Sequence, residues 1–255
     1  MIKIMEAEEL PTISGNSMVD TKALFRKVFG NEIFEDYVGQ LVLLSSPPPE
    51  FDPTLSPEVQ KPKLDEIMKA VREDRELKLV ETLKDRLQLC VEGKNDDLVK
   101  WANLEVERLS QEAFGVALLR VIGYIYTRKA AKEIGKGKRF LKILFVEEWL
   151  RDKRHTRKSR AAASSAAVSY IKLQEHWKSF DIEEIKDAKT SKEAKEIQDS
   201  MLESFWKMNV ADVEMTLSHV CQTVLKDPSA SKDVLRLRAK GMKKIGKIFG
   251  GVKAR

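Results

Sequence analysis

The sequence has few of the residues on which disulfide scaffolds and metal sites depend. It contains two cysteines, Cys90 and Cys221, in 255 residues. Two thiols argue against a disulfide framework and against a four-ligand zinc site. Both lie among apolar residues at helical spacing, which predicts small buried side chains in a reducing compartment.

Catalytic motifs are also absent from the sequence. None of the three histidines, His155, His176 and His219, has a recognisable catalytic neighbour, and there is no HExxH, GxSxG or P-loop motif. The segment GKGK at 135–138 lacks the Lys-Ser/Thr ending of a P-loop. We therefore expect no enzyme activity, no catalytic residue, no metal site and no cofactor.

No apolar run reaches the roughly 18 residues that a membrane-spanning helix needs. The first fifteen residues, MIKIMEAEELPTISG, lack the apolar core of a signal peptide. These absences predict a cytoplasmic protein. The segment RDKRHTRKSR at 151–160 resembles a nuclear-localisation or phosphate-binding patch and leaves nuclear entry open, although a solvated stretch of helix is the simpler interpretation.

Proline is confined to a small part of the chain. Six of the eight prolines lie within 47–62, and none occurs from Lys63 to Asp227. Because a proline inside a helix costs about 3 kcal/mol, the gap favours long helices. We predict an all-α, multi-helix bundle with a short N-terminal helical hairpin. The expected divisions are a flexible N-terminus (1–19), the hairpin (20–45), a Pro-rich linker (46–62), the main helical domain (63–250) and a flexible tail (251–255).

Apolar spacing predicts the helices after the linker. A stripe from Leu64 to Cys90 indicates one long helix that stops at the turn around Gly93. The next helix is expected to run with a bend near Gly115 into the segment 118–133. A further long helix spans about 140–178. The segment EIQDSMLESFWKM at 196–208 leads into NVADVEMTLSHVCQTVL, whose apolar residues keep helical spacing. Asn209 with Asp212 resembles a capping box in which Asp takes the place of Glu.

The segment LLRVIGYIYTRKAAKE at 118–133 combines tyrosines with basic residues. At about 100° per residue, Leu118, Ile122 and Ile125 share one arc, and Lys129 falls in that same arc one turn later. The charges therefore form no separate stripe. The pattern predicts a core helix whose final turns reach solvent, and it is poor evidence for nucleic-acid binding.

Basic charge is concentrated at the C-terminus. Residues 228–255 carry nine Lys or Arg against one acid, so the other 227 residues contribute −2 to the net charge of +6. Around the last helix, a cluster of basic side chains lies roughly opposite an apolar one. The candidate anion-binding residues are Arg236, Lys240, Lys243, Lys244 and Lys247. This helix could bind an anionic membrane surface, RNA or an acidic partner, or it could dock on the core with its lysines in water.

Several segments, in order, resemble the X-domain found after the J-domain in a subgroup of DnaJ-type co-chaperones. The matching segments are ALFRKVFGNEIFEDYVGQL at 23–41, LKDRLQLCVEGK at 83–94, EVERLSQEAFGVALLRVIGYIYTRKAAKE at 105–133, WKMNVADVEMTLSHVCQTVLKD at 206–227 and LRLRAKGMKKIGKIF at 235–249. The resemblance implies a helical module of proteins that assist the folding, targeting or assembly of other polypeptides. The partners it implies are clients or chaperone-system proteins, whereas the scarcity of exposed aromatics disfavours RNA.

The sequence departs from full-length members of that family at their functional site. In those proteins a His-Pro-Asp loop of the J-domain stimulates ATP hydrolysis by a DnaK-type chaperone. Here the histidines are followed by Thr156, Trp177 and Val220, and no Gly/Phe-rich linker is present. We expect a chain that starts after the J-domain, as a stand-alone X-domain or a truncated gene product, and that does not stimulate such an ATPase alone. Its clients and oligomeric state stay open.

Overall fold

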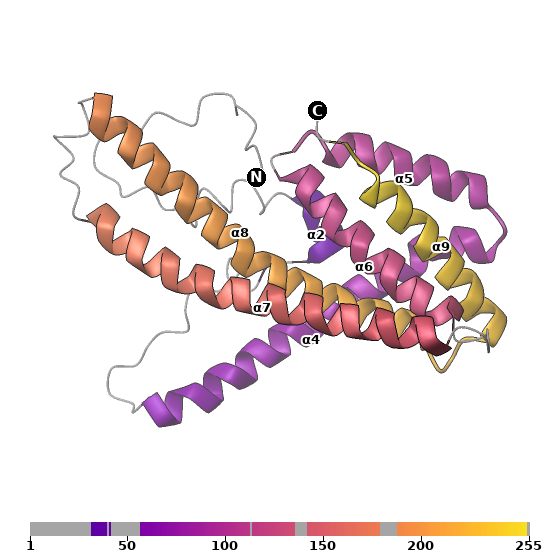
Figure 1. The fold of residues 1–255 in the computed structure, drawn as a ribbon. Coiled ribbons are helices and arrows are strands. Elements are labelled where there is room, and N and C mark those ends of the chain that lie inside the picture. Colours follow the sequence, from indigo (N-terminus) through magenta and orange to yellow (C-terminus); the bar gives the residue numbers. More distant parts are fainter. Residues whose placement is uncertain are drawn as a thin grey trace.

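The structure is a computed structural model that describes residues 32–39, 41, 57–112, 114–135, 142–178 and 188–253. All of its elements are helices (Figure 1). They are α2 (Glu32–Val38), α4 (Pro57–Val91), α5 (Asn95–Leu109), α6 (Gly115–Gly135), α7 (Lys142–Lys178), α8 (Ala188–Leu225) and α9 (Lys232–Gly250). The described ranges contain no strand, so the predicted all-α, multi-helix fold is confirmed. None of these helices combines the length and apolar composition that a bilayer crossing requires.

The helices form two connected parts, the pair of α7 and α8 and the group in which α9 packs on α4, α5 and α6 (Figure 1). The long helices α7 and α8 run antiparallel, and α7 packs mainly on α8. The C-terminal helix α9 packs on α6, α5 and α4. The core between these helices is made of buried apolar side chains, among them Leu87, Leu98, Ile122, Leu217, Cys221, Met242 and Phe249. The helix predicted from the 118–133 pattern, α6, thus lies in the core and ends at Gly135, where the GKGK segment begins.

Glycine allows α6 and α9 to pack backbone against backbone. A Cβ atom on Gly123 would lie 2.7 Å from the carbonyl oxygen of Gly246 and 2.7 Å from the Cα atom of Gly250. A Cβ atom on Gly246 would in turn lie 2.7 Å from the backbone nitrogen of Thr127. These distances are too short for any side chain at either position, so the close approach of α6 and α9 depends on both glycines.

The N-terminal boundaries differ from those predicted. Helix α4 begins at Pro57, inside the expected linker, because proline at a first helical position has no backbone N–H that needs a partner. Helix α2 ends at Val38, since Gly39 adopts φ +64 and turns the chain. Residues 1–31 and 42–56, which include most of the expected hairpin and linker, lie outside the described residues.

The predicted bend near Gly115 is a complete break between two helices. Helix α5 ends at Leu109, and the chain reverses through a turn before α6 begins. At the end of this turn Phe114 adopts φ 60, a left-handed conformation that cannot continue a helix. Its ring stacks on that of Trp206 with a centroid separation of 5.3 Å. A contact between distant parts of the chain thus accompanies the break.

The predicted capping box at Asn209 is wrong, because α8 continues without interruption through this position. Asn209 is 1% exposed and donates a hydrogen bond from Nδ2 to the carbonyl oxygen of Phe205, 2.8 Å away. Asp212 instead pairs with Arg75 of α4, with Oδ2 and Nη1 2.6 Å apart. The two residues that resembled a cap therefore lie in the middle of α8, where Asp212 links this helix to α4.

Candidate interaction surfaces

The five candidate anion-binding residues all lie on α9 and form one face, which we call the basic stripe (Arg236, Lys240, Lys243, Lys244 and Lys247). Four of them are exposed and Lys243 is half-buried. The opposite face of the same helix buries Met242, Ile245 and Phe249. The apolar face thus docks on the core and leaves the basic stripe toward solvent, which is the simpler of the outcomes that the sequence allowed.

No acidic side chain in the described part of the chain forms an ion pair with the basic stripe. Within the described part of the chain, none of its five residues forms an ion pair, and Lys244 donates a hydrogen bond to Oδ1 of Asn95, 2.9 Å away. Like charges three and four residues apart on a helix repel each other. Their field also reaches Cys90, where burial raises the thiol pKa while Lys244 and Lys240 act in the opposite direction. An anionic partner would relieve this repulsion.

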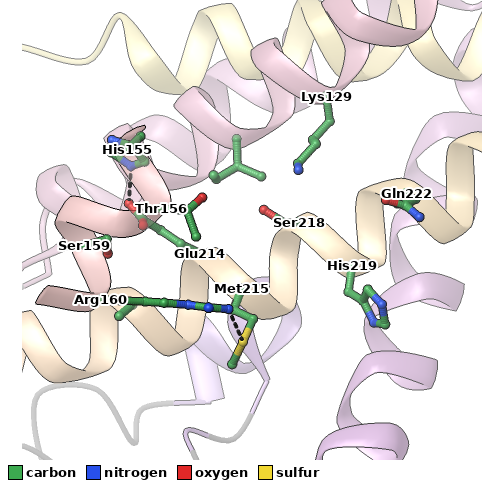
Figure 2. Close-up of a pocket in the computed structure, with 12 residues that line it drawn as sticks. Lys129, His155, Thr156, Ser159, Arg160, Glu214, Met215, Ser218, His219 and Gln222 are labelled. Carbon is green, nitrogen blue, oxygen red and sulfur yellow. Dashed lines mark hydrogen bonds and ion pairs between the residues drawn. The ribbon is translucent and has the colours of Figure 1, made fainter. Parts of the chain in front are cut away.

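A second surface feature is a pocket of about 220 Å³ between α6, α7 and α8, shown in Figure 2. Sequence analysis did not identify it, because its walls come from three helices far apart in the chain. The lining residues are Ile125, Lys129, His155, Thr156, Ser159, Arg160, Ala211, Glu214, Met215, Ser218, His219 and Gln222. Nine of the twelve lining residues are polar or charged, and Ile125, Ala211 and Met215 are apolar.

Two histidines join the helices around this pocket. His155 of α7 lies 2.7 Å from the Glu214 carboxylate of α8, measured from Nε2 to Oε1. His219 of α8 lies 2.8 Å from Oε2 of Glu76 on α4. The ring of His155 also packs against Tyr124, with centroids 4.6 Å apart. Both side chains hold helices together at the pocket wall, and His219 is exposed.

The basic segment 151–160 forms part of α7 beside the pocket. The side chains described as exposed include Lys153, Arg154, Arg157, Lys158 and Arg160, which agrees with the solvated interpretation. His155, Thr156, Ser159 and Arg160 line the pocket. This segment was the one signal in the sequence that could have indicated a polar site here.

Comparison with known proteins agrees with the resemblance found in the sequence. The model of the family described as X-domain of DnaJ-containing matches residues 72–255. An uncharacterized J domain-containing protein of Schizosaccharomyces pombe is 28% identical over 254 residues, covering 90% of this chain and 69% of the relative. DnaJ-like protein 1 of Saccharomyces cerevisiae is 27% identical over 210 residues, covering 72% of this chain and 46% of that relative. No solved structure matches the chain.

Proposed function

Because the chain belongs to the family of X-domains of DnaJ-containing proteins, we propose that it is a noncatalytic module that binds client or partner proteins. A chaperone-related role follows from the family and from the J-domain relatives. The proposal adds that the module acts by binding polypeptides and does not by itself stimulate the ATPase of a DnaK-type chaperone.

The observation that carries the proposal is the extent of the family match, 72–255. It includes most of α4 and all of α5 to α9, and therefore both the basic stripe and the pocket. The protein-binding interpretation is further supported by large apolar side chains in water on the long helices, with Leu77 64% exposed and Val168 and Ile171 each 55% exposed. The last two lie three residues apart on α7, so they form neighbouring contacts on one helix face.

The absence of ATPase stimulation is proposed from the sequence of the histidine sites. None of His155, His176 and His219 is followed by proline. Single-turnover ATP hydrolysis by a DnaK-type chaperone, measured with increasing amounts of the purified chain, should proceed at the unstimulated rate. A J-domain protein serves as the positive control, and a dose-dependent rise with this chain alone would contradict the proposal.

Client binding can be tested by site-specific photo-crosslinking. A photoreactive residue is placed at Ile171, at Leu77 or, as a buried control, at Leu98, which is 0% exposed. The protein is then mixed with a chemically unfolded model client or with the same client in its native form. We expect crosslinks to the unfolded client from at least one exposed position and none from the buried control. Equal crosslinking of native and unfolded client, or none from any position, would count against client binding.

A second candidate function is binding to an anionic surface, either membrane lipid or RNA, through the basic stripe. The observation that favours it is the cationic face of α9, which is largely exposed and forms no ion pair with any residue that the structure describes. A lysine near an anionic bilayer contributes about 1 kcal/mol of attraction. Four or five such residues on one face are therefore enough for peripheral contact.

A further inference from the structure

We infer that a second copy of this chain docks through two complementary helix faces, an acidic one on α4 and a basic one on α7. Each face is a row of side chains spaced four residues apart, and such a row forms a continuous ridge along a helix. The acidic ridge consists of Glu73, Leu77, Glu81 and Asp85, and the basic ridge of Arg160, Ser164, Val168 and Lys172. The inference does not depend on the proposed function, because no client takes part in this contact.

Both ridges face solvent over their whole length. All eight side chains are exposed, and each ridge carries a large apolar side chain in water, Leu77 at 64% and Val168 at 55% exposure. Ile171, also 55% exposed, lies three residues from Val168 and widens the apolar part of that face. Helices α4 and α7 are both held against α8 by their other faces (Figure 1). The two ridges of one chain therefore do not cover each other, and a second copy can supply the missing partner.

Most of the charged groups on the ridges have no opposite charge beside them. Glu81, Asp85 and Lys172 form no ion pair with any residue that the structure describes. The Arg160 guanidinium lies 3.9 Å from the sulfur of Met215, which is a neutral group. These charges are therefore available to a partner of opposite sign.

The two ridges match in length and, when they run in opposite directions, in chemistry. Each spans twelve residues, or about 18 Å at 1.5 Å per residue. An antiparallel arrangement places Leu77 beside Val168 at the same distance from both ends. At the ends of this register an acid lies beside a cation, in the pairs Asp85–Arg160 and Glu73–Lys172.

The parallel arrangement fits less well. It also pairs charges at the two ends, but it places Leu77 beside Ser164 and Glu81 beside Val168. Each apolar side chain would then face a polar one, and the Glu81 carboxylate would lose water without gaining a counter-charge. The antiparallel arrangement is therefore the one that we infer.

The contact resembles an ordinary helix pair in its geometry and a transient interface in its strength. Rows of residues four apart on two helices interdigitate when the helices cross at about −50°, the commonest class of helix packing. Ion pairs in water contribute little each, so we expect weak association that depends on both the charges and the apolar centre. Because the ridges are different surfaces of one chain, the contact can form twice in a two-fold dimer.

Sedimentation velocity of the full chain, from low micromolar to near-millimolar concentration, measures the association. One variant reverses the acidic ridge, Glu81→Lys with Asp85→Lys, and a second reverses the basic ridge, Arg160→Glu with Lys172→Glu. A third variant, Val168→Ser, removes the apolar centre of the contact. All five positions are exposed, so each variant should keep the melting temperature of the unmodified chain.

Each reversal has a matched control with the same change of charge on another exposed surface. For the acidic ridge the control is Glu193→Lys with Glu196→Lys on α8. For the basic ridge it is Arg154→Glu with Lys158→Glu on α7, where Lys158 lies about 160° from Arg160 at 100° per residue. If a reversal variant melts early, the single neutral variants Glu81→Gln and Arg160→Gln replace it.

The unmodified chain should associate as its concentration rises, and added salt should weaken this association by screening the charges. Each reversal should raise the dissociation constant at least about tenfold, because like charges then meet across the contact. Val168→Ser should also weaken association, whereas both controls should behave as the unmodified chain does. An equimolar mixture of the two reversal variants should associate again, since the reversed α4 ridge of one is complementary to the reversed α7 ridge of the other.

A chain that stays monomeric at every concentration would overturn the inference. Equal losses in the reversals and their controls, or a mixture of the two reversal variants that associates no better than either alone, would do the same. Vesicle co-flotation and client crosslinking are measured on the variant with Arg160→Glu and Lys172→Glu. In a monomeric chain, loss of either signal in this variant would identify a lipid surface or a client as the occupant of the basic ridge instead.

Discussion

Arg75 on α4 and Asp212 on α8 form an ion pair in which Nη1 and Oδ2 lie 2.6 Å apart, with side-chain exposures of 3% and 14%. The same guanidinium donates from Nε to the carbonyl oxygen of Val38, 2.6 Å away, at the end of α2. One side chain of α4 therefore ties this helix to both α2 and α8. Such a tether is costly to break from one side, because the remaining charge stays buried without its partner.

Substitution of Arg75 by Met should lower the free energy of unfolding by about 3–5 kcal/mol, because Asp212 loses its buried counter-charge. Urea denaturation followed by circular dichroism measures the change. Lys78→Met is the control, since Lys78 pairs with Asp74 on the exposed face of α4 and ion pairs in water contribute little to stability. Equal losses for the two variants would mean that Arg75 is not a structural tether.

The contact between α6 and α9 predicts different outcomes for two alanine substitutions. Gly123→Ala should destabilise the protein by about 1–3 kcal/mol, since the new Cβ would overlap the backbone of α9. The free energy of unfolding of Gly250→Ala should stay within about 1 kcal/mol of that of the unmodified protein. The new Cβ would meet atoms of other elements no closer than 3.8 Å, and alanine favours a helix. Thermal unfolding of both variants tests the contact, and a Gly123→Ala protein that melts no lower than Gly250→Ala would refute it.

Asp227 makes part of the stability dependent on pH. Its carboxylate lies 2.6 Å from the ammonium of Lys84 and accepts hydrogen bonds from Ser229 and Arg238, and these contacts hold its pKa well below the ordinary value of 3.8. A lowered pKa stabilises the fold fully above the ordinary value and loses this effect as pH falls below it.

Asp227→Asn should therefore melt at a lower temperature than the unmodified protein at pH 7. The difference should stay constant down to about pH 4 and shrink at lower pH, where Asp227 binds a proton in the unfolded state while it is still ionised in the folded state. Melting curves of both proteins from pH 7 to pH 3 measure it. A difference that does not change with pH would show that the charge of Asp227 contributes nothing.

Neutralising four residues of the basic stripe tests the anionic-surface function. Conversion of Lys240, Lys243, Lys244 and Lys247 to Gln should abolish co-flotation with vesicles that contain phosphatidylserine, since each lysine contributes about 1 kcal/mol at such a surface. Stability should change little, because surface substitutions usually stay within about 0.5 kcal/mol each. If RNA is the ligand instead, the affinity for a single-stranded oligonucleotide should fall steeply with salt.

The control for the basic stripe removes the same charge elsewhere on the surface. The substituted residues are the exposed lysines Lys192, Lys195, Lys207 and Lys226. A control variant that loses vesicle binding as completely as the stripe variant would indicate attraction by net charge alone. A protein that never bound the vesicles or the oligonucleotide would remove this candidate function.

Sequence reasoning located features that depend on neighbours along the chain. Gly93 is a turn at φ +80, α6 ends at Gly135, and Cys90 and Cys221 are both buried. The predictions of a capping box at Asn209 and of a bend near Gly115 were wrong, because the structure at both positions involves contacts with residues far away in the sequence. Asp212 pairs with a residue 137 positions earlier, and no local pattern of residues around Asp212 could indicate this.

The sequence by itself predicted an all-α protein of long helices, from the helical spacing of apolar residues and the confinement of proline. It also placed the basic stripe on one helix face, from the amphipathic pattern of the last helix. These properties depend on residues within a few turns of one another, because helix periodicity is local. The tertiary structure alone decided which helices meet. The pocket combines Lys129, Thr156 and Ser218 from three helices, and α6 and α9 approach through Gly123 and Gly246. Such groupings depend on how side chains fill space between distant segments, and no sequence period encodes that packing.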